Sequence, residues 1–112
     1  MPPLEPHPLI YSAIEQKRLI RLIYHGKDRT LEAHDHGILN KSVQLLGYQV
    51  DGISSQPLPN WLLMKVNEIA DLDLLDQTFP GGRATPSGKH LNWDKLFIRV
   101  QPAENLKSTA TE

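Results

Sequence analysis

The sequence predicts a mainly β protein: a small twisted antiparallel sheet of about five strands, curled into a barrel and preceded by one helix. Apolar and polar residues alternate in several short runs between Leu19 and Leu75, and a period of two is typical of strands. Turn sequences rich in glycine, asparagine and proline separate these runs. A stretch with helical spacing lies before the first run. Together these three observations indicate the fold class.

A short helix is expected from Pro8 to about Arg18. Proline suits the first helical position, where no backbone N–H donor is needed. The apolar residues of the segment share one helical stripe: Leu9, Ile10, Ala13 and Ile14. We expect this helix to cover one open end or edge of the sheet, and residues 1–7 to form an extended tail.

The expected strands span residues 19–25, 29–37, 43–50, 61–66 and 70–75. Turns are expected at Gly26-Lys27-Asp28 and at Asn40-Lys41, a tight helical turn over residues 66–69, and a loop over residues 51–60. The third strand is apolar on both faces near its middle, which favours a central position.

The last part of the chain allows more than one secondary structure. Residues 80–90 are rich in glycine and proline and predict a flexible stretch. Residues 93–100 fit a helical stripe, but Phe97–Val100 fits a strand equally well, so both remain open. The polar tail, residues 101–112, is expected to fray. One domain over residues 8–100 follows.

Composition limits the possible functions. The chain has 112 residues, 39% of them apolar and 22% charged, which suits one globular domain. It has no cysteine, which excludes disulfides, thiolate metal sites and cysteine nucleophiles. No apolar run reaches the roughly 20 residues that span a bilayer, and the N-terminus lacks the pattern of a secretory signal. A cytoplasmic protein without a membrane partner is expected.

Charge is nearly balanced but unevenly distributed. The net charge of −1 argues against strong non-specific binding to nucleic acid. Basic residues gather between residues 17 and 41, whereas acids gather between residues 51 and 79. This asymmetry fits either one positive face or an ordinary solvated surface of mixed sign.

Four pieces in order suggest a known family. A Tyr-x-Gly-Lys-x-Arg sequence spans Tyr24–Arg29, an acid and His34 follow, Leu45–Tyr48 forms the next strand, and Leu63–Ile69 closes the unit. In this order the stretch from Ile20 to Phe79 resembles the WYL domain, a bacterial module with an Sm-like, SH3-like β-barrel. Where the family has its signature Trp and Tyr, this chain has Val43 and Gln44, and Lys65 and Glu68 stand in place of two arginines. The resemblance implies a ligand sensor in transcription regulation, and for some members binding of nucleotides or single-stranded nucleic acid.

The candidate ligand-binding residues combine cations with rings. Cations follow phosphates and aromatic rings stack on bases where proteins bind single strands. The set is Arg21, Tyr24, Lys27, Arg29, Tyr48, Trp61 and Lys65, together with His34. The competing interpretation is that the rings pack in the core or rim and the cations are merely solvated.

Other chemistry has weaker support. His34 and His36 are two residues apart on one strand and His25 lies on its neighbour, so a three-histidine zinc site is conceivable. Asp71, Asp73 and Asp76 are more simply the solvated side of an outer strand. No nucleophile and base are recognisable, so we expect neither an enzyme nor a cofactor.

Two functions therefore stay open. The first is a regulatory sensor that recognises a nucleotide or a short single-stranded nucleic acid at a basic face of the barrel. The second is a protein-interaction or self-associating module that uses exposed strands or the loop before Trp61.

Overall fold

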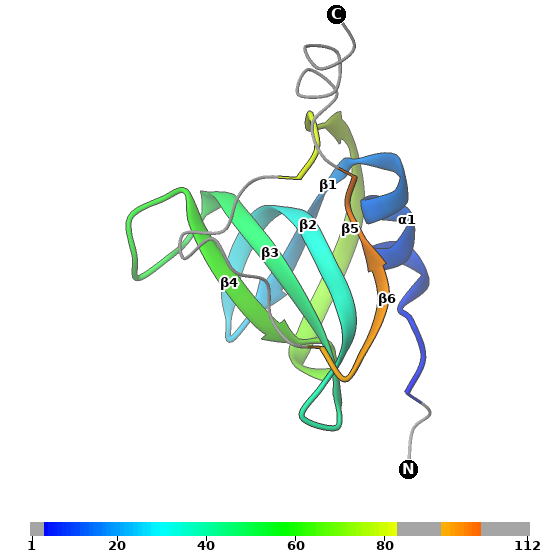
Figure 1. The fold of residues 1–112 in the computed structure, drawn as a ribbon. Helices are drawn as coiled ribbons and strands as arrows, with labels where there is room; N and C mark the ends of the chain where they lie inside the picture. Colours follow the sequence, from blue (N-terminus) through cyan, green and yellow to red (C-terminus); the bar gives the residue numbers. More distant parts are fainter. Residues whose placement is uncertain (1–3, 83–92, 102–112) are drawn as a thin grey trace, which may run out of the picture.

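A single antiparallel sheet of six strands makes up most of this computed structural model, which describes residues 4–82 and 93–101 (Figure 1). The elements are α1 (Pro8–Gln16), β1 (Arg18–Tyr24), β2 (Lys27–Leu39), β3 (Ser42–Gly52), β4 (Asn60–Lys65), the 3-10 turn η1 (Val66–Glu68), β5 (Ile69–Thr78) and β6 (Lys95–Arg99). The expected mainly β class and N-terminal helix are confirmed. Most of the stretch expected to be flexible, residues 80–90, and nearly all of the C-terminal tail lie outside the described residues.

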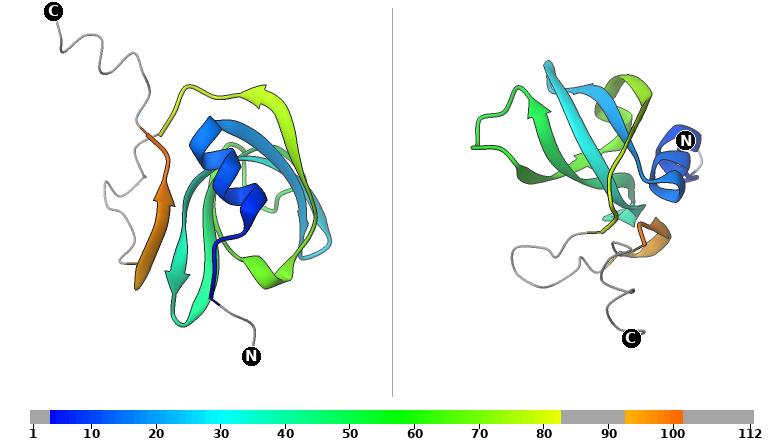
Figure 2. Two further views of the ribbon diagram at one scale, coloured as in Figure 1. Left: turned by 90° about the vertical axis from the view of Figure 1, so that its right-hand side faces the viewer. Right: turned by 90° about the horizontal axis from the view of Figure 1, so that it is seen from above.

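The strand order is β4-β3-β2-β1-β5, with β6 paired to β2 as a side branch. The first half of β2 pairs with β1, from Lys27 to Glu32, and its second half pairs with β6, from Asp35 to Ile38. A register shift between Ala33 and Asp35 marks the change. Bulges of this kind bend a strand and increase its twist. The long strand β2 thus pairs with β1 along its first half and with β6 along its second half, and the sheet curls around it (Figure 2).

The sixth strand settles the alternative left open by the sequence. Lys95–Arg99 is a strand rather than a helix, and it lies antiparallel to β2. Its start is fixed by the carboxylate of Asp94, which accepts the backbone N–H of Asn40 at 2.9 Å. Long-range pairing therefore decided between two local patterns that fitted equally well.

The core lies inside the curl of the sheet. The fully buried apolar side chains include Ile20, Leu22, Leu31, Leu45 and Met64 from β1 to β4, and Ile10, Ala13 and Ile14 from α1. The alternation of β1, with Ile20, Leu22 and Tyr24 inward, is as expected. The helix α1 contacts β1, β2, β5 and β6 and lies across one opening of the curl (Figure 2), which confirms its expected covering role.

The helix starts as predicted and ends earlier. Pro8 occupies the first turn, and Nδ1 of the N-cap residue His7 accepts the backbone N–H of Leu9. Lys17 has a positive φ of 54° and terminates the helix, a common geometry just past the last turn. The end is therefore Gln16, not Arg18. Within residues 4–82 and 93–101, no helix is long and apolar enough to cross a bilayer.

Two tight hairpins join the first three strands. Asn40 and Lys41 both have positive φ and form the second turn as expected. The first turn lies at His25 and Gly26, with φ values of 53° and 73°, so Lys27 begins β2 instead of lying in the turn. Two-residue hairpin turns favour positive φ at both positions, and His25 accepts this geometry while its ring stacks on Tyr24 at 4.0 Å. The expected tight turn after β4 is present as η1.

Candidate functional site

The predicted site residues divide between the two faces of the sheet. Tyr24 and Arg29 are buried within the curl, each about 7% exposed. Three others lie on the outer side of the sheet: Arg21 and Tyr48, which alternate with buried neighbours, and Trp61, which pairs with Tyr48 in the β3–β4 ladder. The eight residues therefore do not form one basic face.

Arg29 has an internal partner. Its Nη1 donates to Oε1 of Gln49 at 2.9 Å, and its guanidinium lies 5.9 Å from the ring centre of Tyr24. Gln49 in turn donates to the carbonyl oxygens of Asp51 and Ile53. Arg29 thus links β2 to β3 and, through Gln49, to the start of the following loop. Its guanidinium contacts groups within the fold.

Tyr24 is also structural. Its hydroxyl accepts the backbone N–H of Lys65 at 3.2 Å, so the end of β1 is linked to the end of β4. A buried tyrosine usually finds a partner for its hydroxyl in this way. Packing therefore explains the position of Tyr24 without a ligand.

Lys27, another predicted site residue, is half-buried at the start of β2.

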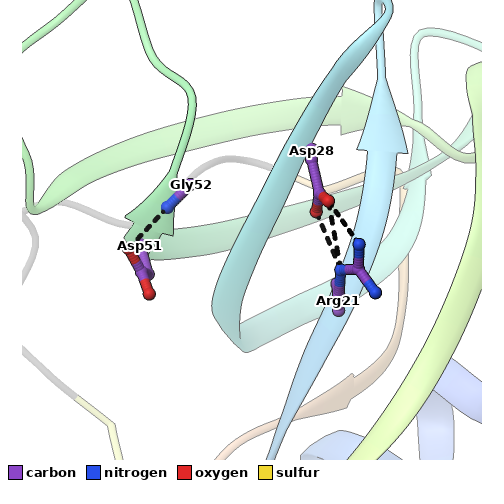
Figure 3. A network of polar contacts seen from close by, with 4 residues as sticks. All are labelled: Arg21, Asp28, Asp51 and Gly52. Atoms are coloured by element: carbon purple, nitrogen blue, oxygen red, sulfur yellow. Dashed lines mark hydrogen bonds and ion pairs between the residues drawn. The ribbon is translucent and has the colours of Figure 1, made fainter.

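Arg21 lies among acids on the outer side of β1. Its guanidinium forms a two-pronged ion pair with the carboxylate of Asp28, with Nε 3.0 Å from Oδ1 (Figure 3). This hydrogen bond is the main reason that the pKa of Asp28 falls below its ordinary value and that of Arg21 rises. Asp73 lies directly opposite Arg21 in the β1–β5 ladder. These acidic surroundings do not favour phosphate at Arg21.

The end of β3, at Asp51 and Gly52, packs closely on β2 near Asp28. In Figure 3, the carboxylate of Asp51 accepts the backbone N–H of Gly52 at 2.8 Å. Gly52 has a φ of 98°, and a Cβ there would lie 2.3 Å from the carbonyl oxygen of Asp28. The end of β3 therefore packs tightly on β2 at this point.

Three aromatic rings come together around His34. Tyr48 and Trp61 are opposite each other in the β3–β4 ladder, with ring centres 5.0 Å apart. His34 lies 4.8 Å from the Trp61 ring, edge to face, and 5.7 Å from the ring of Phe79. His34 and Phe79 are buried, whereas Tyr48 and Trp61 are partly exposed. The buried pair therefore supports two rings that water can reach.

An acid lies beside this cluster. Glu32 is 3% exposed and faces Tyr48 across the β2–β3 ladder. Nδ1 of His34 lies 3.0 Å from the carbonyl oxygen of Glu32, so Nδ1 carries the proton. Its Nε2 lies 4.0 Å from the Glu32 carboxylate. The orientation of the His34 ring is thereby fixed within the cluster.

The outer side of β4 continues from Trp61 to a cation. Alternation with buried Met64 places Trp61, Leu63 and Lys65 on the same side of the strand. Leu63 is 37% exposed, and Lys65 is exposed as well. We call the surface formed by Tyr48, Trp61, Leu63 and Lys65 the aromatic face. Lys65 lies about 13 Å along the strand from Trp61.

The three-histidine zinc hypothesis is wrong. His25 is exposed and lies 2.7 Å from the Glu68 carboxylate, which lowers the pKa of Glu68 through their hydrogen bond. The bulge in β2 places His34 and His36 in different surroundings, although they are two residues apart. In the described part of the chain, no three His, Cys, Asp or Glu side chains are grouped as a metal site.

The acids of β5 are where the sequence placed them. Asp71, Asp73 and Asp76 are exposed on an edge strand that pairs with β1. Asp76 lies 3.1 Å from Arg18. The positive φ of Asp71, 49°, accompanies a bulge in the ladder, and such bulges protect an edge from further pairing.

Sequence reasoning missed several partners that complete the site. Phe79 supports His34, Gln49 binds Arg29, and Asp35, which is buried, forms an ion pair with the partly exposed Arg99 at 3.0 Å. All three contacts join positions 20 or more residues apart, which local alternation does not reveal. For Glu32, the sequence offered one indication: it lies two residues before His34 in an alternating strand, a spacing that places both side chains on the same face.

No family model, curated protein or solved structure matches the chain. The resemblance of Ile20–Phe79 to the WYL domain accordingly stays a prediction.

Proposed function

We propose that the chain is a binding module that holds a nucleotide or a short single-stranded nucleic acid on the aromatic face. One observation carries this proposal: the rings of Tyr48 and Trp61 lie 5.0 Å apart on adjacent strands and both are partly exposed. Every nucleobase has a flat π-face, and stacking on an aromatic side chain contributes about 1–3 kcal/mol per base. A base stacked on Trp61 is supported from behind by His34.

The phosphate in this proposal is directed to Lys65. Lys65 lies on the same side of β4, about 13 Å along the strand from Trp61, so it suits the phosphate of a neighbouring nucleotide in a short strand. Arg21 and Arg29 take no part, because each is bound within the fold. Base stacking therefore supplies most of the affinity, and we expect a weaker dependence on salt than a face with four cations would give.

The regulatory role follows from the resemblance to WYL domains. In that family the module is implied to sense a ligand rather than convert it. We extend this to the present chain as a sensor whose ligand-loaded state is read by another component. The proposal needs no catalytic group on the aromatic face.

Binding to a fluorescently labelled short oligothymidylate at low salt, followed by anisotropy, tests the proposal. Trp61→Ala is expected to weaken binding at least about fivefold, since the loss of one stacking ring costs 1 kcal/mol or more. Trp61→Phe keeps a ring and is expected to lose less. Tyr11→Ala, which removes an exposed ring from α1, is the matched control and leaves the affinity unchanged. Absence of binding by the wild type, or equal affinity of Trp61→Ala, contradicts the proposal.

A second candidate rests on a different observation. Leu63 is exposed in the middle of β4, the strand at one end of the sheet order, and an apolar edge strand is a ready template for pairing with another chain. Under this alternative the protein self-associates or binds an extended partner through β4. The oligonucleotide then gives no signal, and Leu63→Glu converts a dimer to a monomer in light scattering.

A further inference from the structure

Two histidines hold the start of α1 in place, and the rings of both accept hydrogen bonds. The backbone N–H of His7 donates to Nε2 of His36 at 2.9 Å. Nδ1 of His7 accepts the N–H of Leu9 at 3.2 Å and so caps α1. An imidazole nitrogen accepts a hydrogen bond only when it carries no proton. Both contacts at the start of α1 therefore require neutral rings.

The surroundings of His36 fix which nitrogen is the acceptor. The side chain is fully buried, and its Nδ1 lies 3.0 Å from the carbonyl oxygen of Gln44, so Nδ1 carries the proton. Nε2 is then left to accept from His7. A second proton would place an N–H at Nε2 against the N–H of His7 and would bury a charge. Burial is accordingly the main cause that lowers the pKa of His36.

The neighbouring elements bring little that would compensate a charge on His36. Before and within α1 the charged residues are Glu5 and Glu15, both exposed. On β6, Lys95 lies over the ring of Phe97 and Arg99 is bound to Asp35, while β3 between Ser42 and Val50 has no charged residue. The other titratable group acting on His36 is His7, and its positive form lowers the pKa of His36 further.

We propose that the contact between His7 and His36 is an acid-sensitive latch that holds α1 on the sheet at neutral pH and releases it on acidification. The helix covers the core with Ile10, Ala13 and Ile14, which are at most 1% exposed. Release therefore uncovers apolar surface at one opening of the curled sheet. The latch is independent of the aromatic face and of any ligand bound there.

The direction of the pH effect follows from proton uptake. A released His36 has an ordinary pKa of about 6.5 and binds a proton that the latched state excludes. The latch is fully effective above this value and weakens as the pH falls through and below it. For one histidine the released fraction rises by up to about tenfold per pH unit, until the lowered pKa of the latched state is reached.

Amide hydrogen exchange between about pH 7.5 and pH 5.5, corrected for the intrinsic exchange rate, tests the latch. Protection of the α1 amides is expected to fall by up to about tenfold per pH unit below pH 6.5, whereas the amide of Leu45 in β3 keeps its protection. Unchanged protection of α1 overturns the proposal. An equal loss at Leu45 also overturns it, because the whole domain would then be opening.

Substitutions assign the effect to the ring. His36→Gln keeps an acceptor close to the position of Nε2 but does not titrate, so protection of α1 becomes independent of pH. His25→Gln removes an exposed histidine and keeps the wild-type pH dependence. His7→Asn keeps an oxygen that can cap α1 but does not titrate, and so measures how much the His7 cap contributes to the pH dependence of α1 protection. If His36→Gln fails to fold, NMR titration of the His36 ring in the wild type decides: its midpoint must lie below pH 6.5, where the loss of α1 protection levels off, and a midpoint at or above pH 6.5 overturns the latch.

Discussion

At the scale of single residues, two charged side chains are buried where the sequence suggests exposed positions. Arg29 and Asp35 are both almost fully buried, and each has a specific partner on another strand, Gln49 and Arg99 respectively. Trp93 donates a further hydrogen bond to Asp35 at 3.3 Å. Residue type alone favours an exposed position for arginine and aspartate, so the partner rather than the residue explains the burial.

Asp35→Ala is expected to destabilise the protein by about 2 kcal/mol. Removing one member of a buried ion pair leaves the other poorly solvated, which costs about 3–5 kcal/mol when both are fully buried, and Arg99 is one-third exposed. Urea unfolding of the variant measures the loss. Asp73→Ala, which removes an exposed aspartate from β5, serves as the control. A loss no larger than that of the control contradicts the structural role of Asp35.

The same scale shows how far alternation can be trusted. It placed Ile20, Leu22 and Tyr24 inside correctly, because β1 has no bulge opposite β2. It failed for His34 and His36, since a bulge in β2 interrupts the period between Ala33 and Asp35. Such a bulge depends on pairing with β3 and β6, and a single strand does not reveal it.

At the scale of elements, the β2–β6 contact is the clearest feature that the sequence left undecided. Gly37 lies where β6 crosses most closely, and a Cβ on this residue would meet the carbonyl oxygen of Lys95 at 2.3 Å. The absence of a side chain is therefore what allows β6 to pair. Local spacing in residues 93–100 fitted both helix and strand, so only this long-range approach could decide between them.

Gly37→Ala is expected to destabilise the protein by roughly 2 kcal/mol or more, because backbone atoms must move to admit the methyl group. Gly26→Ala is the matched comparison: its Cβ would meet nothing within 4 Å, although its φ of 73° is strained for alanine. That strain costs about 1 kcal/mol. Thermal unfolding compares the two, and a smaller effect for Gly37→Ala contradicts the close approach of β6.

At the scale of the whole molecule, the mainly β class and most strand positions could be predicted, because period-two alternation and turn residues are local signals. The candidate site could be predicted only in part. Tyr48, Trp61 and His34 do gather, whereas Arg21 and Arg29 are occupied by Asp28 and Gln49. Whether a cation is free for a ligand depends on which residues of the neighbouring strand lie close to it, and this is known only once the strands are paired.

The aromatic face as the binding surface is the central claim, and amide chemical-shift mapping tests it most directly. An isotope-labelled sample is titrated with a short oligothymidylate and with adenosine monophosphate at low salt. We expect the largest shifts at Tyr48 and at the backbone and indole N–H groups of Trp61, because ring currents of a stacked base act on groups nearby, and a smaller shift at Lys65 from the phosphate. An unchanged spectrum, or shifts centred on Arg21 and Asp28 or on α1, would contradict the claim.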